Sequence, residues 1–274
     1  MGNGEWGTSD APAFLHFLFP ITCYQSPPYG GAVVADGGIE SQNVVGYNTV
    51  PSIGQAQYVA LGVQFENCNG GAIPVKDLVS VADIQGGPTI GASDQIWRWN
   101  TASAAWTKYF YYSSRGVKRW VVSTDTTKET TDTVPAGETV FFLRSGNTTS
   151  LTLSGAVKAM EGASSVTVSQ AQLAFMSNPW PVPVSIASFN SNYAEGSTPQ
   201  GGPSIGASDQ IWRWNTETAA WTKYFFYSSR GVTRWVVSTD TTKATTDEIP
   251  AGEGFFFQRA GNTATIAIAA PSAN

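Results

Sequence analysis

The distribution of apolar and polar residues along the chain predicts short β-strands. The aromatic segment Trp106–Tyr112 and the segment Val117–Ser123 are separated by the turn sequence Ser-Ser-Arg-Gly, which predicts a hairpin. Thr139–Arg144 and Thr148–Leu153 flank the sequence Ser-Gly-Asn, which predicts another hairpin. No window shows the 3.6-residue period of a helix. Turn signals recur about every 8–12 residues, a spacing typical of an antiparallel β-sandwich.

This pattern occurs twice, because the chain contains a tandem repeat. Residues 86–153 match residues 201–268 without a gap at an offset of 115, with 51 identities in 68 positions. A shift of one strand residue would turn every following side chain to the other face. The gapless match therefore predicts the same turns in both copies. We expect two antiparallel β-sandwich modules, residues 37–157 and 158–274, each of ordinary domain size.

Residues 1–36 have no counterpart in the repeat and are expected to form an N-terminal arm. Its segment Ala11–Tyr24 is apolar at both odd and even positions, so both faces of an extended strand would be apolar. Such a strand must be covered on two sides, either by its own first module or by a neighbouring copy of the protein. The residues expected in this contact are Phe14, Leu15, Phe17, Leu18, Phe19 and Ile21.

Composition and charge limit the range of partners. Only 13% of the residues are charged and the net charge is −5, which argues against nucleic acid or an anionic membrane as partner. The apolar run in the arm is too short to span a bilayer. Residues 1–75 hold five acidic residues and no lysine or arginine, so the whole net charge lies at this end. Such an end suits head-to-tail contact with a neutral or basic surface.

Few residues are suited to metal binding or nucleophilic catalysis. The single histidine, His16, lies in an apolar run, and the sequence contains no HExxH or P-loop motif. Cys23 and Cys68 are 45 residues apart and neither belongs to a CxxC motif, which argues against zinc. The two cysteines either form a disulfide or remain buried thiols. We expect no cofactor and no metal.

Two groups of residues keep other functions open. Exposed coplanar tryptophans would form a platform for a surface glycan, whereas buried ones would fill the sandwich. Glycoside hydrolysis would need two carboxylates facing each other across a cleft. The tryptophans are Trp97, Trp99 and Trp106 with their repeat counterparts Trp212, Trp214 and Trp221, and the carboxylate pairs are Asp94 with Glu138 and Asp209 with Glu253.

Three short segments of the second module carry a resemblance. They are Pro-Ala-Gly-Glu-Gly-Phe-Phe-Phe at 250–257, Asp-Gln-Ile at 209–211 with Trp214, and Asn-Pro-Trp at 178–180. These segments resemble a recurring element of tandem β-rich repeat modules in uncharacterised surface proteins that bacteria export. The first module departs from the pattern at 63–65 and at 139–140. The resemblance implies an extracellular β-module of unassigned activity, and it carries over no catalytic residue.

These features predict a non-enzymatic structural protein that is extracellular or at the cell surface. We expect its main partner to be itself, in a fibre, sheet or shell held together by the N-terminal arm and the module edges. A glycan-binding adhesive module and a glycoside hydrolase remain as alternatives. Exposure of the six tryptophans would favour the glycan-binding module, and a cleft lined by carboxylates would favour the hydrolase.

Overall fold

The computed structural model describes residues 45–68, 70–81, 84–157, 163–194 and 196–269. Within these ranges every pair of named strands is antiparallel, and the helical segments are 3-10 turns of three or four residues. The predicted all-β fold of sandwich type is confirmed. The predicted N-terminal arm lies outside the described residues, together with its six contact residues and His16.

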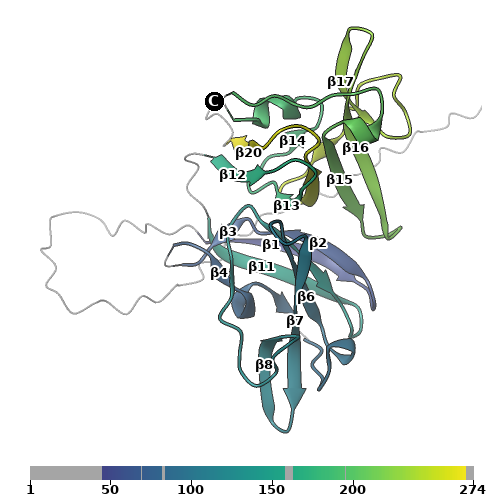
Figure 1. Cartoon of the computed structure of the whole chain (residues 1–274). Coiled ribbons are helices and arrows are strands. Elements are labelled where there is room, and N and C mark those ends of the chain that lie inside the picture. Colours follow the sequence, from purple (N-terminus) through teal and green to yellow (C-terminus); the bar gives the residue numbers. More distant parts are fainter. Residues whose placement is uncertain (1–44, 69, 82–83, 158–162, 195, 270–274) are drawn as a thin grey trace, which may run out of the picture. The chain divides into compact units, whose positions relative to one another are not determined.

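The first module contains a five-stranded sheet and a smaller sheet (Figure 1). The large sheet has the strand order β2-β10-β6-β7-β8, with β2 (Tyr58–Gly62), β6 (Gln95–Asn100), β7 (Ala105–Ser114), β8 (Val117–Val122) and β10 (Thr139–Leu143). In the small sheet β11 (Thr149–Val157) pairs with β1 (Val45–Ile53), β3 (Phe65–Glu66) and β5 (Ser80–Val81). The remaining elements are the pair β4 (Ile73–Pro74) and β9 (Thr133–Val134) and the 3-10 turns η1 (Val75–Asp77) and η2 (Ile90–Ala92).

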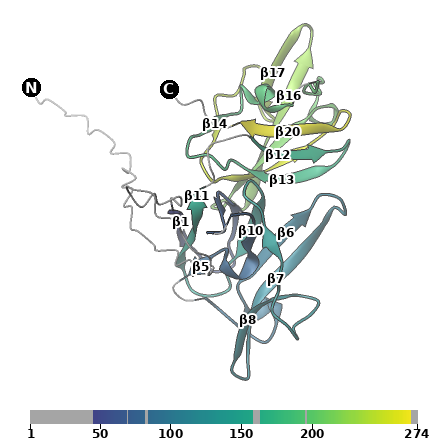
Figure 2. The same ribbon diagram turned by 90° about the vertical axis from the view of Figure 1, so that its left-hand side faces the viewer.

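The second module repeats the large sheet. Its order is β13-β19-β15-β16-β17, and the bounds of β15 to β19 are those of β6 to β10 shifted by 115. Figure 2 shows β13, β16 and β17 of this sheet. The strands are β12 (Ala163–Val168), β13 (Leu173–Ser177), β14 (Val184–Ser185), β15 (Gln210–Asn215), β16 (Ala220–Ser229), β17 (Val232–Val237), β18 (Glu248–Ile249), β19 (Gly254–Gln258) and β20 (Ala264–Ala269). β12 pairs with β20 and β14 pairs with β18, and the 3-10 turns are η3 (Phe189–Asn192) and η4 (Ile205–Ala207).

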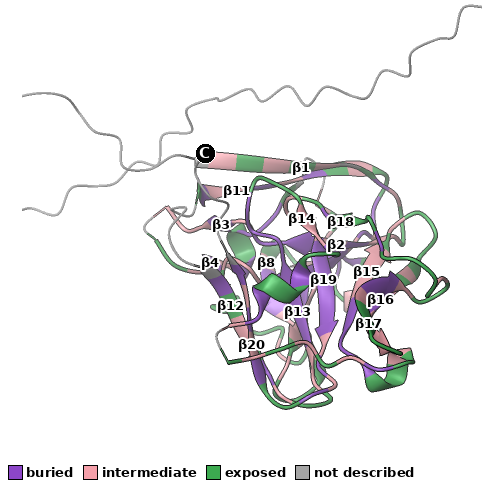
Figure 3. Ribbon diagram, turned by 90° about the horizontal axis from the view of Figure 1, so that it is seen from above, coloured by how far each residue is buried: buried purple, intermediate pink, exposed green. Residues whose placement is uncertain are grey.

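Each module has its own apolar core, which takes side chains from both of its sheets. In the first module the buried cluster contains Val140 and Phe142 of β10 together with Leu151 and Leu153 of β11. The two-residue spacing is that of a strand with one face turned to the core. The second module has a separate cluster, and β13 and β19 are largely buried in Figure 3. All described residues nevertheless belong to one compact unit, Ile39–Asn274.

The hairpin predicted at Ser-Ser-Arg-Gly is confirmed, but the one predicted at Ser-Gly-Asn is wrong. β7 pairs with β8 across the first turn. In contrast, β10 lies between β2 and β6, so it has no free edge for β11, which pairs with β1 in the other sheet. Residues 145–147 therefore connect one sheet to the other.

A buried ion pair holds this connection between the sheets. Arg144, the last residue before it, pairs with Asp94, and the two side chains are 2% and 0% exposed. Asp94 also accepts hydrogen bonds from the backbone amides of Gln85 and Ser145, both at 2.8 Å. The guanidinium in turn donates to the carbonyl of Asn147 at 2.7 Å. The pair thus fixes both ends of the connection, in place of the backbone bonds that a hairpin would have made.

A tyrosine is hydrogen-bonded to an aspartate at the same place in each module. Tyr224 donates to Asp247 at 2.6 Å, as Tyr109 does to Asp132 at 2.7 Å. Burial raises the pKa of Tyr224 to about 12 from the ordinary value of 10.0. The folded protein therefore keeps this proton after the unfolded chain has lost it. Stability from this group is complete below pH 10 and is lost as the pH rises towards 12.

We expect Tyr224→Phe to weaken this alkaline loss of stability. At neutral pH the variant should be about 1 kcal/mol less stable, because it lacks one hydrogen bond. Between pH 10 and pH 12 its stability should fall less steeply than that of the parent protein, since it has no buried phenol to ionise at this position. Urea unfolding at a series of pH values measures both effects. Equal slopes for the two proteins would contradict the assignment.

Candidate functional site

An aromatic cluster joins the two modules, and we call it the inter-module cluster. Phe141, Phe175 and Phe256 form its centre, and each is only 5–6% exposed. On β6 the side chain of Ile96 faces the core of its own module, so the alternating residues Trp97 and Trp99 face outward. These outward faces of the two large sheets supply the half-buried rings that pack against the centre, including Trp97, Trp99, Trp106, Trp212, Trp214 and Trp221.

The contacts in this cluster are reciprocal. The indole Nε1 of Trp99 donates to the carbonyl of Leu173 at 2.7 Å, and that of Trp214 donates to the carbonyl of Tyr58 at 2.8 Å. Trp214 is the repeat counterpart of Trp99, and Leu173 is that of Tyr58. A surface that contacts its own counterpart in this way is the mark of a two-fold interface between identical subunits. Here the two surfaces belong to one chain.

Backbone hydrogen bonds between the modules are reciprocal in the same way. The amide of Gly62 donates to the carbonyl of Gly252 at 3.0 Å, and the amide of Ser177 donates to the carbonyl of Gly137 at 2.9 Å. Both pairs are related by the offset of 115. A Cβ atom on Gly62 would lie 2.5 Å from the Cβ atom of Ser177, so only one of these two equivalent positions can carry a side chain.

The rings of the six tryptophans contact protein side chains on several sides. Trp99 and Trp214 meet Phe256 and Phe141 edge to face, with centroids 5.6 Å apart in both cases. The ammonium of Lys108 lies 3.7 Å from the ring centroid of Trp97, and Lys223 takes the same place over Trp212 at 3.8 Å. These contacts favour packing between modules over an open platform for sugars.

The candidate catalytic carboxylates are held by arginines. Asp209 pairs with Arg259 as Asp94 pairs with Arg144, and both aspartates are fully buried. Glu138 accepts two hydrogen bonds from Arg98, at 2.6 and 2.9 Å, and Glu253 is bound by Arg213 in the same way. The hydrogen bond to Glu138 raises the pKa of the Arg98 guanidinium. Ion-paired carboxylates of this kind fit a structural role better than general acid and base catalysis.

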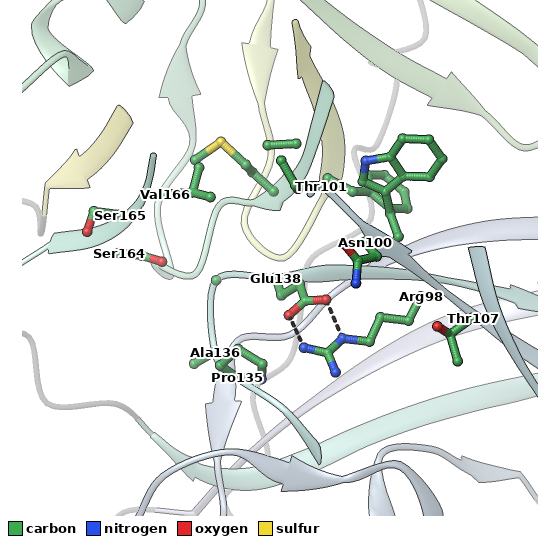
Figure 4. A pocket seen from close by; sticks show the side chains of 15 residues that line it. Arg98, Asn100, Thr101, Thr107, Pro135, Ala136, Glu138, Ser164, Ser165 and Val166 are labelled. Atoms are coloured by element: carbon green, nitrogen blue, oxygen red, sulfur yellow. Dashed lines mark hydrogen bonds and ion pairs between the residues drawn. The ribbon is translucent and has the colours of Figure 1, made fainter. Parts of the chain in front are cut away.

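A pocket of about 580 Å³ lies where the two modules meet, next to the inter-module cluster. Figure 4 shows Arg98 and Glu138 on one side of it and Ser164 and Ser165 on the other. The first module supplies Arg98, Trp99, Asn100, Thr101, Thr107, Pro135, Ala136, Gly137 and Glu138, and the second supplies Ser164, Ser165, Val166, Ala174, Phe175 and Met176. The Arg98–Glu138 pair carries the only charges among these lining residues, so the lining is electrically neutral.

A comparison with family models found no match, and neither did comparisons with curated proteins and with solved structures. The site is therefore interpreted from its own geometry. Among the described residues, no group of three or more His, Cys, Asp or Glu is placed to hold a metal. In that part of the chain, no helix is long and apolar enough to cross a membrane.

The cysteine prediction falls partly outside the structure. Cys68 is disulfide-bonded and has no free thiol. Cys23 lies outside the described residues, so a disulfide between Cys23 and Cys68, one of the two alternatives that the sequence leaves open, stays a prediction.

The arginine partners of the buried aspartates and the pocket between the modules were not predicted from the sequence. Arg144 and Arg259 directly follow the apolar strands β10 and β19 at equivalent positions of the repeat. This repetition could have indicated that they are the buried partners of Asp94 and Asp209. The pocket had no comparable signal, because it is formed by residues of both modules that are far apart in the chain.

Proposed function

We propose that the protein is a non-enzymatic structural subunit, extracellular or at the cell surface, that associates with itself in a fibre, sheet or shell. Its N-terminal arm and its module edges would make the contacts. The observation that carries this proposal is the duplication of one basic hairpin with an exposed tip. The hairpin β7–β8 of the first module has an equivalent in β16–β17 of the second. An arm that binds a hairpin of the next copy makes a head-to-tail contact, which generates open filaments, and a second equivalent hairpin gives each subunit a further attachment point.

The tips of these hairpins present an apolar residue together with one or two basic residues. We define the tips as Arg115–Lys118 and Arg230–Thr233, all of whose residues are exposed. Val117 and Val232 are 40% and 42% exposed, which places them among the most exposed large apolar residues described. Strand β8 is the last strand of its sheet, as β17 is of its own. Terminal strands and their turns are the parts of a sheet that most readily contact another chain.

Charge supplies a complementary partner for the tips within the same chain. The hairpin of residues 105–122 contains four basic residues and no acidic one, and the hairpin of residues 220–237 contains three basic residues and no acidic one. Residues 1–44 contain four acidic residues and no basic one. Opposite charges steer association and orient the partners. The apolar residues of the arm would add about 1.5–3 kcal/mol each on burial, before the cost of ordering the segment.

We expect substitutions at the tips to limit assembly in steps. Val117→Asp or Val232→Asp alone should reduce the amount of assembly, because only one tip per subunit remains to bind an arm, and the double variant should stay monomeric. Both positions are exposed, so each substitution should change stability by no more than about 0.5 kcal/mol. Negative-stain microscopy and light scattering measure the assemblies. Val182→Asp is the matched control, since Val182 is 41% exposed but lies outside the hairpins. A double variant that assembles like the parent would overturn the role of the tips.

The arm is tested in the same assay by a chain that starts near Gly37. Loss of assembly with retained fold supports the arm as the connector. If the shortened chain assembles as the full chain does, the arm is not needed. If it unfolds, the arm belongs to the core of its own module, which is the intramolecular alternative.

The two alternative functions have less support. The rings that would form a glycan platform are half-buried between the modules, and the carboxylates that would catalyse glycoside hydrolysis are bound to arginines. These interactions account for both residue groups in structural terms.

A further inference from the structure

The pocket between the modules lies on one side of an interface whose contacts are otherwise reciprocal. The Arg98–Glu138 pair on this side has its counterpart in Arg213–Glu253 on the other. What differs is the segment from the opposite module that faces each pair. The strands of these segments, β1 and β12, fall in the part of the repeat where the two copies have diverged.

The pairing of these strands shows which residues are equivalent. Asn48 of β1 pairs with Leu153, and Ser164 of β12 pairs with Ile268, which is the repeat counterpart of Leu153. Ser164 therefore takes the place of Asn48, although the sequence offset of 115 would align it with Thr49. The cause is an irregularity in β1 between Val50 and Ile53, which shifts the register by one residue.

The presence of Ser164 in the place of Asn48 changes the side chains that line this part of the interface. On the Arg213 side, the Asn48 amide donates to Gln64 at 2.9 Å, and both side chains lie close to Gly252. On the Arg98 side, the residue facing Gly137 is the smaller Ser164. The repeat counterpart of Gln64 is Pro179, which has no amide to reach across. Shorter side chains on this wall leave room beside Arg98 and Glu138.

We propose that this pocket binds a neutral saccharide. Its volume of about 580 Å³ falls within the roughly 300–1,000 Å³ typical of small-molecule sites. The ion pair balances its own charge, so neither an anion nor a cation is preferred. The side chains of Arg98 and Glu138 remain 31% and 20% exposed, and so can donate to and accept from neighbouring hydroxyl groups of one ring.

The remaining lining fits the same ligand class. Asn100, Thr101, Thr107, Ser164 and Ser165 offer amide and hydroxyl groups, which exchange hydrogen bonds with sugar hydroxyls in either direction. Apolar contact for the C–H groups of a sugar ring comes from Trp99, Val166 and Met176. This site is distinct from the open platform considered for the six tryptophans, and it does not depend on self-association.

The test uses the full chain and three disaccharides, namely maltose, cellobiose and N,N′-diacetylchitobiose, each at millimolar concentration. Binding is measured by calorimetry and by the NMR signal of the Trp99 indole N–H. We expect at least one disaccharide to bind and to shift this signal. Failure of all three to bind, or binding that leaves the Trp99 signal unchanged, would overturn the proposal.

Two substitutions and a matched control locate the binding. Ser164→Asn introduces on the Arg98 side, where the pocket lies, the larger side chain that Asn48 provides on the Arg213 side. It should weaken binding at least tenfold. Arg98→Gln removes the charged donor and should have an effect of similar size. Arg213→Gln breaks the equivalent ion pair away from the pocket, and should change affinity by less than twofold. Equal losses in the Arg98 and Arg213 variants, or unchanged binding in Ser164→Asn, would show that the saccharide binds elsewhere.

Discussion

Replacing Asp94 with alanine is expected to lower the free energy of unfolding of the first module by about 3–5 kcal/mol. The substitution leaves the guanidinium of Arg144 buried without its counter-charge, and it removes the acceptor of the Gln85 and Ser145 amides. An unpaired buried charge is among the most destabilising defects that a single substitution can create. The connection between the two sheets should loosen first, because the pair holds residues 145–147. Urea unfolding measures the loss.

The exposed ion pair of Asp240 with Lys243 provides the control. Its side chains are 37% and 80% exposed. Asp240→Ala should therefore cost much less than Asp94→Ala, because water screens an ion pair at the surface. The assignment would fail if Asp94→Ala cost no more than Asp240→Ala.

The second large effect is expected for Phe256→Ala, with a loss of about 3–5 kcal/mol. Phe256 stacks on Phe175 at 4.2 Å between ring centroids, and it also contacts Trp99 and Trp221 edge to face or tilted. Because Trp99 belongs to the first module and Phe175 to the second, the cavity left by this substitution weakens both surfaces. We expect the two modules of the variant to unfold at separate urea concentrations, whereas those of the parent unfold together.

Phe189→Ala distinguishes this loss of coupling from ordinary core damage. Phe189 is fully buried in the core of the second module, where it contacts Phe255 and Trp235. Its removal should destabilise the second module by a similar amount. If both substitutions gave the same unfolding profile, the inter-module cluster would not be what couples the modules.

The tandem repeat made much of the fold predictable. Because strand positions cannot shift without turning side chains to the other face, the gapless match implied equal strand bounds in the two copies. The face of β6 that carries Trp97 and Trp99 was harder to place. Neither face of this strand is uniformly polar or apolar, since Ile96 in the module core shares its face with Arg98 and Asn100, while Trp97 and Trp99 on the other face pack in the inter-module cluster. Without a regular alternation of polar and apolar positions, the sequence does not indicate which face meets solvent.

Pairing between strands that are distant in the chain determines two features that could not be predicted from the sequence. The turn at 145–147 has the composition of a hairpin, yet β2 and β6 already occupy both edges of β10. Which edges are free depends on strands that are distant in the chain. The pocket was hidden for a related reason. The irregularity in β1 places Ser164 opposite Ile268, so the equivalence of Ser164 and Asn48 follows from strand pairing and is absent from the sequence alignment.

The reciprocal contacts between the modules have a consequence for how the protein can vary. In a pair of identical subunits, each substitution at a two-fold interface appears on both sides at once. Here both sides are encoded in one chain, so a change at Asn48 leaves Ser164 untouched. The covalent link also keeps the two surfaces together at any dilution. The chain thus retains the stability of a symmetric dimer, while each half of its interface is free to acquire a task that the other half does not share.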